Sequence, residues 1–340
     1  MPRLLRRWIK KARIRLPLLS GSSETARSRW LVARFKDSLS GGLFARVRRL
    51  ELGYRLYLPS GSSRRDSLPL IVMLHGCQQN PLSFAEGTRM NALAEERRCA
   101  VLYPEQSVHS NPLRCWNWFD SAALLGEGDA GLIARLIDQV TERRPIDPRR
   151  VYVVGMSAGA AMACVLAVRH SRLFAACASH SGVMYGAARS PSQALTVMRS
   201  GPSLADVEQA RRLWLEVRES ALTVPTLVIH GERDTKVNPV NADRIIEQLQ
   251  ARSEVTDPSA GVLQACDELC IDDGGRSSRQ RDYTRQGQIV VRRVLVEGLG
   301  HAWSGGDTRH EFNDAEGPDA SRLILDFVMQ YQRETVKVQR

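Results

Sequence analysis

The chain has 340 residues, of which 43% are hydrophobic and 25% charged, and these are the proportions of an ordinary globular protein. No apolar run reaches the roughly 18 residues that a membrane-spanning helix needs, and no segment repeats at a fixed period. The net charge of +11 comes from the amino-terminal arm: residues 1–50 hold 14 Lys and Arg against 2 Asp and Glu, whereas the remainder holds 34 against 35. A nucleic-acid-binding surface spread over the body of the chain is therefore not expected.

The basic arm, residues 1–48, is expected to lie outside the folded domain, which we place at 49–335. Its apolar side chains fall on one face of a helix and are surrounded by Arg and Lys. This pattern fits a helix that contacts an anionic membrane surface, and equally a solvated extension. Pro17 interrupts the short apolar stretch that follows, which a cleavable signal would not show. The apolar residues of the face are Leu4, Leu5, Trp8, Ala12 and Leu16.

Beyond the arm, short apolar runs alternate with helical patterns, which predicts a mostly parallel central sheet with helices on both faces, an α/β fold. Two segments interrupt this alternation: 186–223 is expected to form a small cap-like insertion, and 252–288 a surface excursion. The predicted strands are 54–59, 70–74, 99–103, 151–154, a run ending at Ala178, 226–230 and 289–296. The predicted helices are 84–98, 130–140, the segment after Ser157 and 320–330.

The segment VYVVGMSAGAAMA places Ser157 between a predicted strand and a predicted helix. Gly155 and Gly159 flank the serine, as in the G-x-S-x-G turn that presents a nucleophile above a sheet. Such a turn strains the serine backbone and needs small neighbours, and the helix that follows favours negative charge near the serine. Ser157 is therefore the predicted nucleophile of a serine hydrolase.

A serine nucleophile needs a base, and the base needs a carboxylate that orients it. In folds with this turn the chain order is Ser, then acid, then His. Asp234 follows the predicted strand 226–230, and His301 lies in a glycine-rich loop after the last predicted strand. We therefore predict a triad of Ser157, Asp234 and His301. The rival acids and bases are Asp129, Asp147, Asp243, His75, His180 and His230.

The oxyanion hole should use two backbone N–H groups. One belongs to Ala158, the residue after the nucleophile, and the other to Cys77, in the loop that follows the predicted strand 70–74. Gln78, the next residue in that loop, is expected either to shape the acyl pocket or to make local hydrogen bonds.

The seven cysteines are odd in number and cannot all pair within one chain. Cys99, Cys164 and Cys177 lie in apolar runs, where we expect core residues. Cys266 and Cys270 lie in a polar stretch that offers no second metal-binding pair, so we expect no metal site.

Several long segments resemble the polyhydroxybutyrate (PHB) depolymerase-family esterases over about residues 50–330. They are YRLYLP, LIVMLHGCQQNPLSFAEGTRMNALAEE, VLYPEQ, RCWNWFD, RVYVVGMSAGAAMA, FAACASHSG, GHAWSGG and GPDASR. The resemblance implies an α/β-hydrolase fold and a serine esterase that works without a cofactor. It implies the nucleophile at Ser157, the acid at Asp234, the base at His301 and the oxyanion donors at Cys77 and Ala158.

The same resemblance implies the substrate class and the cellular address. The family includes polyester depolymerases and relatives of feruloyl and acetylxylan esterases, so we expect a small, oligomeric or polymeric carboxylic ester as substrate. Many members are secreted, which favours an extracellular address. A cytoplasmic or membrane-peripheral address is the alternative, because we recognise no cleavable signal in the arm.

Two tryptophans are candidate substrate-binding residues beside Gln78. Trp303 lies two residues after His301, so we expect it at the mouth of the cleft, where it would stack on an acyl or aromatic group. Trp118 is the second candidate, and core packing together with Trp116 is the alternative for it.

Cys77 and Cys115 lie in two loops that the family shares and that follow different strands. Loops after parallel strands gather at one edge of a sheet, so we expect a disulfide between these two residues that holds the oxyanion N–H in place. Two free thiols are the alternative, and they are the rule in a reducing cytoplasm.

Two other functions remain open from the sequence. A serine peptidase uses the same fold and triad, although 186–223 is short for a peptidase gating domain. A protein of a different class would bind nucleic acid or an anionic membrane through its basic arm.

Overall fold

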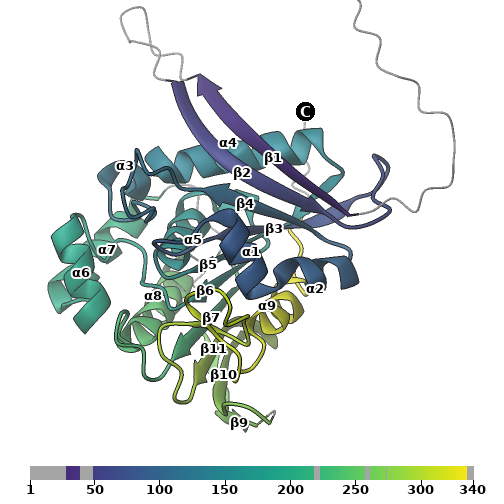
Figure 1. Cartoon of the computed structure of the whole chain (residues 1–340). Helices are drawn as coiled ribbons and strands as arrows, with labels where there is room; N and C mark the ends of the chain where they lie inside the picture. Colours follow the sequence, from purple (N-terminus) through teal and green to yellow (C-terminus); the bar gives the residue numbers. More distant parts are fainter. Residues whose placement is uncertain (1–27, 39–48, 218–222, 257–260, 273, 335–340) are drawn as a thin grey trace, which may run out of the picture.

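One central sheet runs through the residues that this computed structural model describes, 28–38, 49–217, 223–256, 261–272 and 274–334 (Figure 1). Its strand order is β1-β2-β4-β3-β5-β6-β7-β11-β10-β8, and β9 pairs with β10. The strands from β4 to β11 in this order are parallel, and antiparallel strands extend both edges. The strands are β1 Arg29–Ser38, β2 Arg49–Leu58, β3 Leu68–Leu74, β4 Ala100–Glu105, β5 Ile146–Met156, β6 Ala176–His180, β7 Thr226–Gly231, β8 Gln264–Ala265, β9 Leu269–Ile271, β10 Ser278–Arg285 and β11 Gln288–Val296.

The central strands are buried on both faces because their side chains are apolar at successive positions. In β3, Leu70 and Val72 join the core on one face of the sheet, and Ile71 and Met73 join the core on the other. All four of these side chains are inaccessible to solvent. The apolar run that predicted a buried parallel strand therefore contributes to two cores at once.

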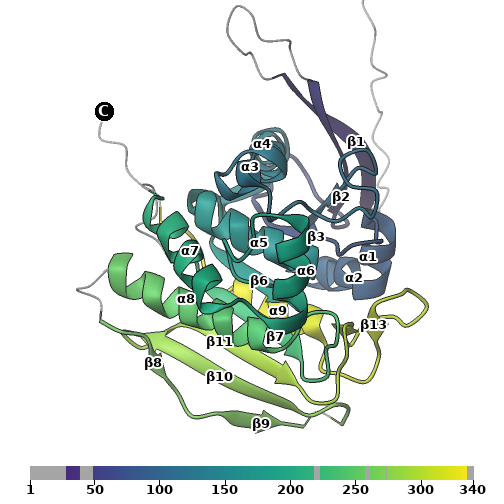
Figure 2. The ribbon, with the colours of Figure 1, turned by 90° about the vertical axis from the view of Figure 1, so that its left-hand side faces the viewer.

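Helices cover both faces of the sheet (Figure 2). One face packs against α1, α2 and α9, and the other against α3, α4, α5 and α8, with α6 and α7 outside them. The helices are α1 Pro81–Thr88, α2 Met90–Glu96, α3 Ser121–Leu124, α4 Gly128–Arg143, α5 Ala158–Arg169, α6 Pro191–Ser200, α7 Leu204–Leu215, α8 Val240–Thr256 and α9 Ala320–Val328. None of the described helices is both long and apolar enough to cross a membrane.

The predicted start of the folded domain at residue 49 is wrong. Residues 29–38 form β1, which pairs with β2 along its whole length, and Phe35 is buried in the core. This strand also carries Arg29, Arg34 and Lys36, so by its charge it resembles the rest of the basic arm. The rest of the arm, including the predicted helical face at residues 4–16, lies outside the described residues.

The predicted cap-like insertion contains two helices, whereas the predicted surface excursion is part of the sheet. Within 186–223, α6 and α7 are the helices, and Ser203 caps α7 by accepting a hydrogen bond from the Asp206 N–H. Within 252–288, the end of α8 is followed by β8, β9 and β10, and β10 pairs antiparallel with β11. Most side chains of β10 are polar and only partly buried, so its composition resembles that of a surface loop.

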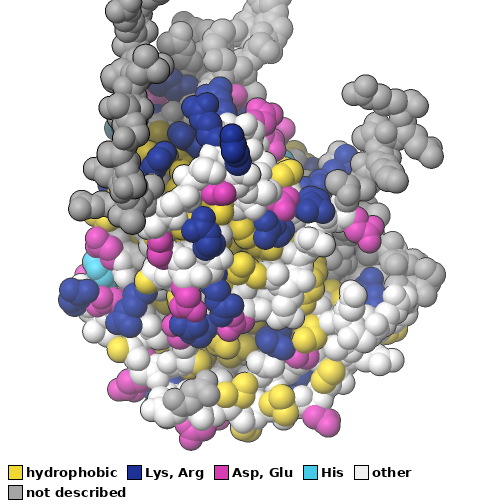
Figure 3. Space-filling model, turned by 90° about the vertical axis from the view of Figure 1, so that its right-hand side faces the viewer, with side chains coloured by type: hydrophobic (Ala, Val, Ile, Leu, Met, Phe, Trp, Pro, Cys, Tyr) yellow, Lys and Arg dark blue, Asp and Glu magenta, His cyan; other side chains and the backbone are white. Residues whose placement is uncertain are grey.

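The predicted helix 84–98 is also divided in two. Arg89 has a left-handed backbone conformation with φ of 53° and separates α1 from α2. Asn80 begins α1 by accepting hydrogen bonds from the N–H groups of Leu82 and Ser83. On the face shown in Figure 3, Lys and Arg side chains are interspersed with Asp and Glu, as the near-neutral body of the chain requires.

Candidate active site

Ser157 stands at the turn between β5 and α5, and its backbone has φ of 56° and ψ of −120°. Two close backbone contacts explain the flanking glycines. A Cβ atom on Gly155 would lie 2.2 Å from the carbonyl of Gly159, and one on Gly159 would lie 2.0 Å from the carbonyl oxygen of Leu74. Strand and helix therefore approach each other too closely for any side chain, which raises Ser157 above the end of the sheet.

The three residues of the predicted triad form one hydrogen-bonded chain. His301 Nε2 lies 3.1 Å from Ser157 Oγ, and His301 Nδ1 lies 2.7 Å from Asp234 Oδ2. The side chains come from three loops, which follow β5, β7 and β11 at the same edge of the sheet. In this arrangement His301 can accept a proton from Ser157 while its second nitrogen is held by a carboxylate.

The loop after β7 fixes the carboxylate of Asp234. Its Oδ1 accepts hydrogen bonds from the N–H groups of Lys236 (2.9 Å) and Val237 (2.8 Å), and its Oδ2 faces His301. Burial by itself raises the pKa of Asp234, but the hydrogen bond and charge of His301 and the Val237 N–H outweigh burial, so the pKa lies below its ordinary value. Asp234 is therefore a carboxylate at neutral pH.

The loop after β3 is tied down at several points beside Ser157. The Gln78 N–H donates to the Leu113 carbonyl at 2.7 Å, and the Gly76 N–H donates to Gln79 Oε1 at 2.8 Å. A disulfide joins Cys77 to Cys115, the pair expected from the sequence. These ties hold the Cys77 backbone against the loop that precedes α3.

A cleft of about 220 Å³ opens at Ser157 and His301. Gln78 lines it, and so do residues that the sequence reasoning did not name, among them Met156, Met198, Lys236 and Phe312. Met198 comes from the cap helix α6, and the ring centroid of Phe312 lies 6.4 Å from that of His301. Met156 and Lys236 carried a signal in the sequence, because they lie one and two residues from Ser157 and Asp234.

The expectation that Trp118 and Trp303 bind substrate is wrong. Trp303 is 1% exposed, stacks on the His180 ring at a centroid distance of 5.0 Å and donates a hydrogen bond to Ser321. Trp118 is 3% exposed and packs edge-on against Phe119. Trp303 starts the short strand β12 (Trp303–Ser304), which pairs with β13 (Asn313–Asp314) and turns the indole inward, so Trp303 supports the His301 loop from below.

The rival histidines are buried and held by other partners. His75 uses both ring nitrogens, one with the Gly76 carbonyl and one with the Gln106 N–H, and burial lowers its pKa to about 4. Burial lowers the pKa of His180 to about 3, and it also lowers the pKa of His230, whose Nε2 bonds the Val237 carbonyl. All three are neutral at pH 7 and support the loops around His301.

The rival acids also have other partners. Asp129 accepts hydrogen bonds from Gln106 and Asn117, Asp147 pairs with Arg150 at 2.8 Å, and Asp243 pairs with Arg293 at 3.3 Å. No group of three or more His, Cys, Asp or Glu side chains with the spacing of a metal site occurs among the described residues.

The sequence profile of the family described as Esterase PHB depolymerase matches residues 52–267. The chain is 33% identical over 199 residues to poly(3-hydroxyalkanoate) depolymerase C of Paucimonas lemoignei, which covers 56% of this chain and 46% of that protein. It is 28% identical over 225 residues to acetylxylan esterase A of Talaromyces purpureogenus, which covers 64% of this chain and 55% of that protein. The chain spans about half the length of these relatives.

Among solved structures, the fold is similar to that of an acetyl xylan esterase from Aspergillus awamori. The TM-score is 0.66 at 17% identity, and the superposition covers 88% of this chain and 99% of that one. At this identity the likeness establishes an α/β-hydrolase fold.

Proposed function

The chain belongs to the Esterase PHB depolymerase family, and on this premise we propose that it is a serine esterase that hydrolyses carboxylic esters through an acyl-enzyme. The observation that carries this proposal is the continuous hydrogen-bonded chain from Ser157 through His301 to Asp234. Sequence relatives named as a depolymerase and an acetylxylan esterase support ester hydrolysis as the reaction.

In the first half of the reaction, Ser157 Oγ attacks the ester carbonyl carbon and His301 Nε2 takes the hydroxyl proton. Asp234 keeps the Nδ1–H of His301 pointing inward and stabilises the imidazolium that forms. The protonated His301 then donates its proton to the departing alcohol, and the acyl group remains on Ser157.

In the second half, a water molecule takes the place of the alcohol. His301 removes a proton from this water, the resulting hydroxide attacks the acyl carbon, and Ser157 leaves with its proton restored. The carboxylic acid product then dissociates.

The negative charge that develops on the carbonyl oxygen is held by the N–H groups of Ala158 and Cys77. Ala158 is the first residue of α5 and follows Ser157 directly, so its N–H has no acceptor within the helix and is free to bind the oxyanion. The disulfide and the hydrogen bond of the Gln78 N–H support this role for Cys77, because they hold its N–H in place. A donor that is held in place does not need to reorganise during the reaction.

The cleft suggests which esters fit. Met156, Met198 and Phe312 provide apolar walls for a short acyl chain or an aromatic ring, and Gln78 and Lys236 provide polar ones. We propose hydroxyalkanoate oligomers and acetyl or feruloyl esters as the substrate class. The Cys77–Cys115 disulfide supports an oxidising, extracellular address for the enzyme.

The experiment that tests this function is a panel of esters assayed with the purified chain and with Ser157→Ala. The panel contains p-nitrophenyl acetate, butyrate and octanoate, methyl ferulate, 3-hydroxybutyrate oligomers and a peptide p-nitroanilide. We expect hydrolysis of the short esters by the natural chain and none by the variant. Hydrolysis of the anilide with kcat/KM above that of every ester would instead make the chain a peptidase.

A further inference from the structure

Arg252 is a buried cation that no described carboxylate neutralises. It lies on α8 and is 2% exposed, and neither Nη1 nor Nη2 has a hydrogen-bond partner among the described residues. Its guanidinium carbon lies 5.9 Å from the centre of the Trp214 ring, so the group contacts an aromatic face.

The Arg252 guanidinium does not become neutral by losing a proton. Burial lowers the pKa of Arg252, the charge of Tyr185 raises it and the charge of Arg169 lowers it; the result is about 10, so the group is a cation at neutral pH. Leaving a buried charge uncompensated costs several kcal/mol. A negative charge beside Arg252, which the described residues do not supply, would remove this cost.

A small cavity lies next to Arg252. Its volume is about 20 Å³, and Thr223, Thr226 and Gln248 line it together with apolar residues of α5 and β6. Thr226 donates its hydroxyl to the Val224 carbonyl, and both ends of the Gln248 amide are bonded to the Tyr185 backbone. Thr223 Oγ1 and the two Arg252 Nη atoms have no hydrogen-bond partner among the described residues, and both residues line the cavity.

We propose that this cavity binds a monatomic anion such as chloride, held by the Arg252 guanidinium and the Thr223 hydroxyl. The free groups all donate hydrogen bonds, which selects an anion over a cation. The volume exceeds the 10–15 Å³ that one water-sized particle needs and is too small for phosphate, sulfate or a carboxylic acid. Water would fill the space but would leave the charge unbalanced.

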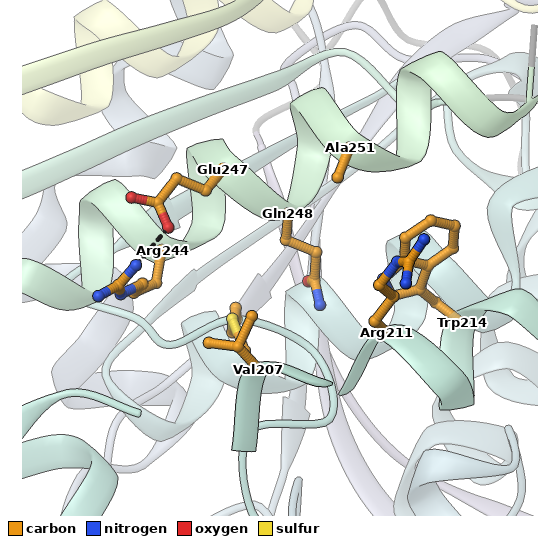
Figure 4. A pocket seen from close by; sticks show the side chains of 8 residues that line it. Val207, Arg211, Trp214, Arg244, Glu247, Gln248 and Ala251 are labelled. Carbon is orange, nitrogen blue, oxygen red and sulfur yellow. Dashed lines mark hydrogen bonds and ion pairs between the residues drawn. The ribbon is translucent and has the colours of Figure 1, made fainter. Parts of the chain in front are cut away.

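The position of the cavity gives the anion a structural role. Thr226 is the first residue of β7 and Cys177 lies at the start of β6, so the cavity is at the amino ends of the strands, opposite the candidate active site. A larger groove of about 190 Å³ lies between α7 and α8 (Figure 4). Gln248 lines both this groove and the small cavity. Arg211 and Arg244 line this groove, and the Glu247 carboxylate pairs with Arg244 (Figure 4). The bound anion would therefore join α8 to the sheet beneath the cap.

The first test is thermal unfolding at constant ionic strength while sodium gluconate is replaced by sodium chloride. The natural chain should gain several degrees in a saturable way, because an anion that binds only the folded state stabilises it. Arg252→Met should lose this response, while the matched variant Arg212→Met, at an exposed arginine of α7, should keep it. Equal responses in all three proteins would overturn the proposal.

The second test does not depend on the variant folding. Crystals of the natural chain grown in sodium bromide should show an anomalous peak within hydrogen-bond distance of the Arg252 Nη atoms. A water molecule without anomalous signal, or a carboxylate of the chain in that place, would show that the cavity holds no anion.

Discussion

At the carboxyl ends of the parallel strands, each polar group of the triad has a partner within the chain: Ser157 meets His301, and His301 meets Asp234. At the amino ends of the same sheet, Arg252 and Thr223 line a cavity, and Arg252 Nη1 and Nη2 and Thr223 Oγ1 have no hydrogen-bond partner among the described residues. The charges of the first arrangement are balanced within the chain. On our proposal, the charge of the second is balanced by an anion from solution.

The largest expected effect comes from substituting residues of the hydrogen-bonded triad. Ser157→Ala, His301→Ala and Asp234→Asn should each lower kcat by roughly 10⁴-fold or more. The double variant of Ser157 and His301 should lose little beyond the larger single effect, because the residues act as a unit. Kinetics on a short p-nitrophenyl ester measure this. If the losses in log kcat were additive in the double variant, the residues would act independently.

The turn that carries Ser157 should tolerate no side chain at Gly159. A Cβ there would lie 2.0 Å from the Leu74 carbonyl oxygen, so Gly159→Ala must push strand and helix apart, at a cost of roughly 3 kcal/mol or more. The control is Gly300→Ala, where a Cβ meets nothing within 4 Å and the backbone is not left-handed. Urea unfolding of both variants decides the matter, and equal stabilities would refute the steric argument.

The sequence predicts those site residues whose positions depend on their near neighbours in the chain, and it fails where a position depends on a distant pairing. The turn at Ser157 was predictable because the steric demand falls on residues two positions away. Asp234 and His301 were predictable because parallel strands bring their following loops to one edge. Trp303 was placed wrongly because its direction depends on the pairing of β12 with β13, whose partner lies ten residues on.

The same distinction explains the errors in the fold. β1 was hidden because its basic residues were counted with the arm, although Phe35 packs into the core. β10 resembles a loop in sequence because most of its side chains are polar and only partly buried. The Arg252 cavity had no signal at all, because it arises where α5, α8 and two strands meet, and no spacing within one segment encodes that meeting.

The disulfide should have an intermediate effect on both stability and catalysis. Cys115→Ser opens a link between residues 38 positions apart, which should cost about 2–4 kcal/mol of unfolding free energy. It should also lower kcat more than it changes KM, because the Cys77 N–H loses its support. Cys266→Ser, at an exposed free thiol, is the control. An unchanged kcat in Cys115→Ser would show that the bridge does not position the donor.

The last effect concerns the buried histidines that support the site, and it is absent at neutral pH. Burial lowers the pKa of His75 to about 4 and of His180 to about 3, below their ordinary value of 6.5. Between pH 6.5 and about 4 the unfolded chain therefore binds more protons, so stability should fall as the pH falls, by up to about 1.4 kcal/mol per pH unit for each histidine. His180→Gln should show a shallower pH dependence than His109→Gln, which changes an exposed histidine. If the unfolding free energies of the two variants fell in parallel with falling pH, His180 would not be the group responsible for the pH dependence.

The most direct test of the central claim, that Ser157 is activated by His301 and Asp234, is labelling with a fluorophosphonate followed by peptide mapping. The natural chain should carry one adduct, on Ser157, and the labelling rate should fall by orders of magnitude in His301→Ala. Ser157→Ala should carry none. An adduct on another serine, or undiminished labelling of Ser157→Ala, would contradict the assignment of the active site.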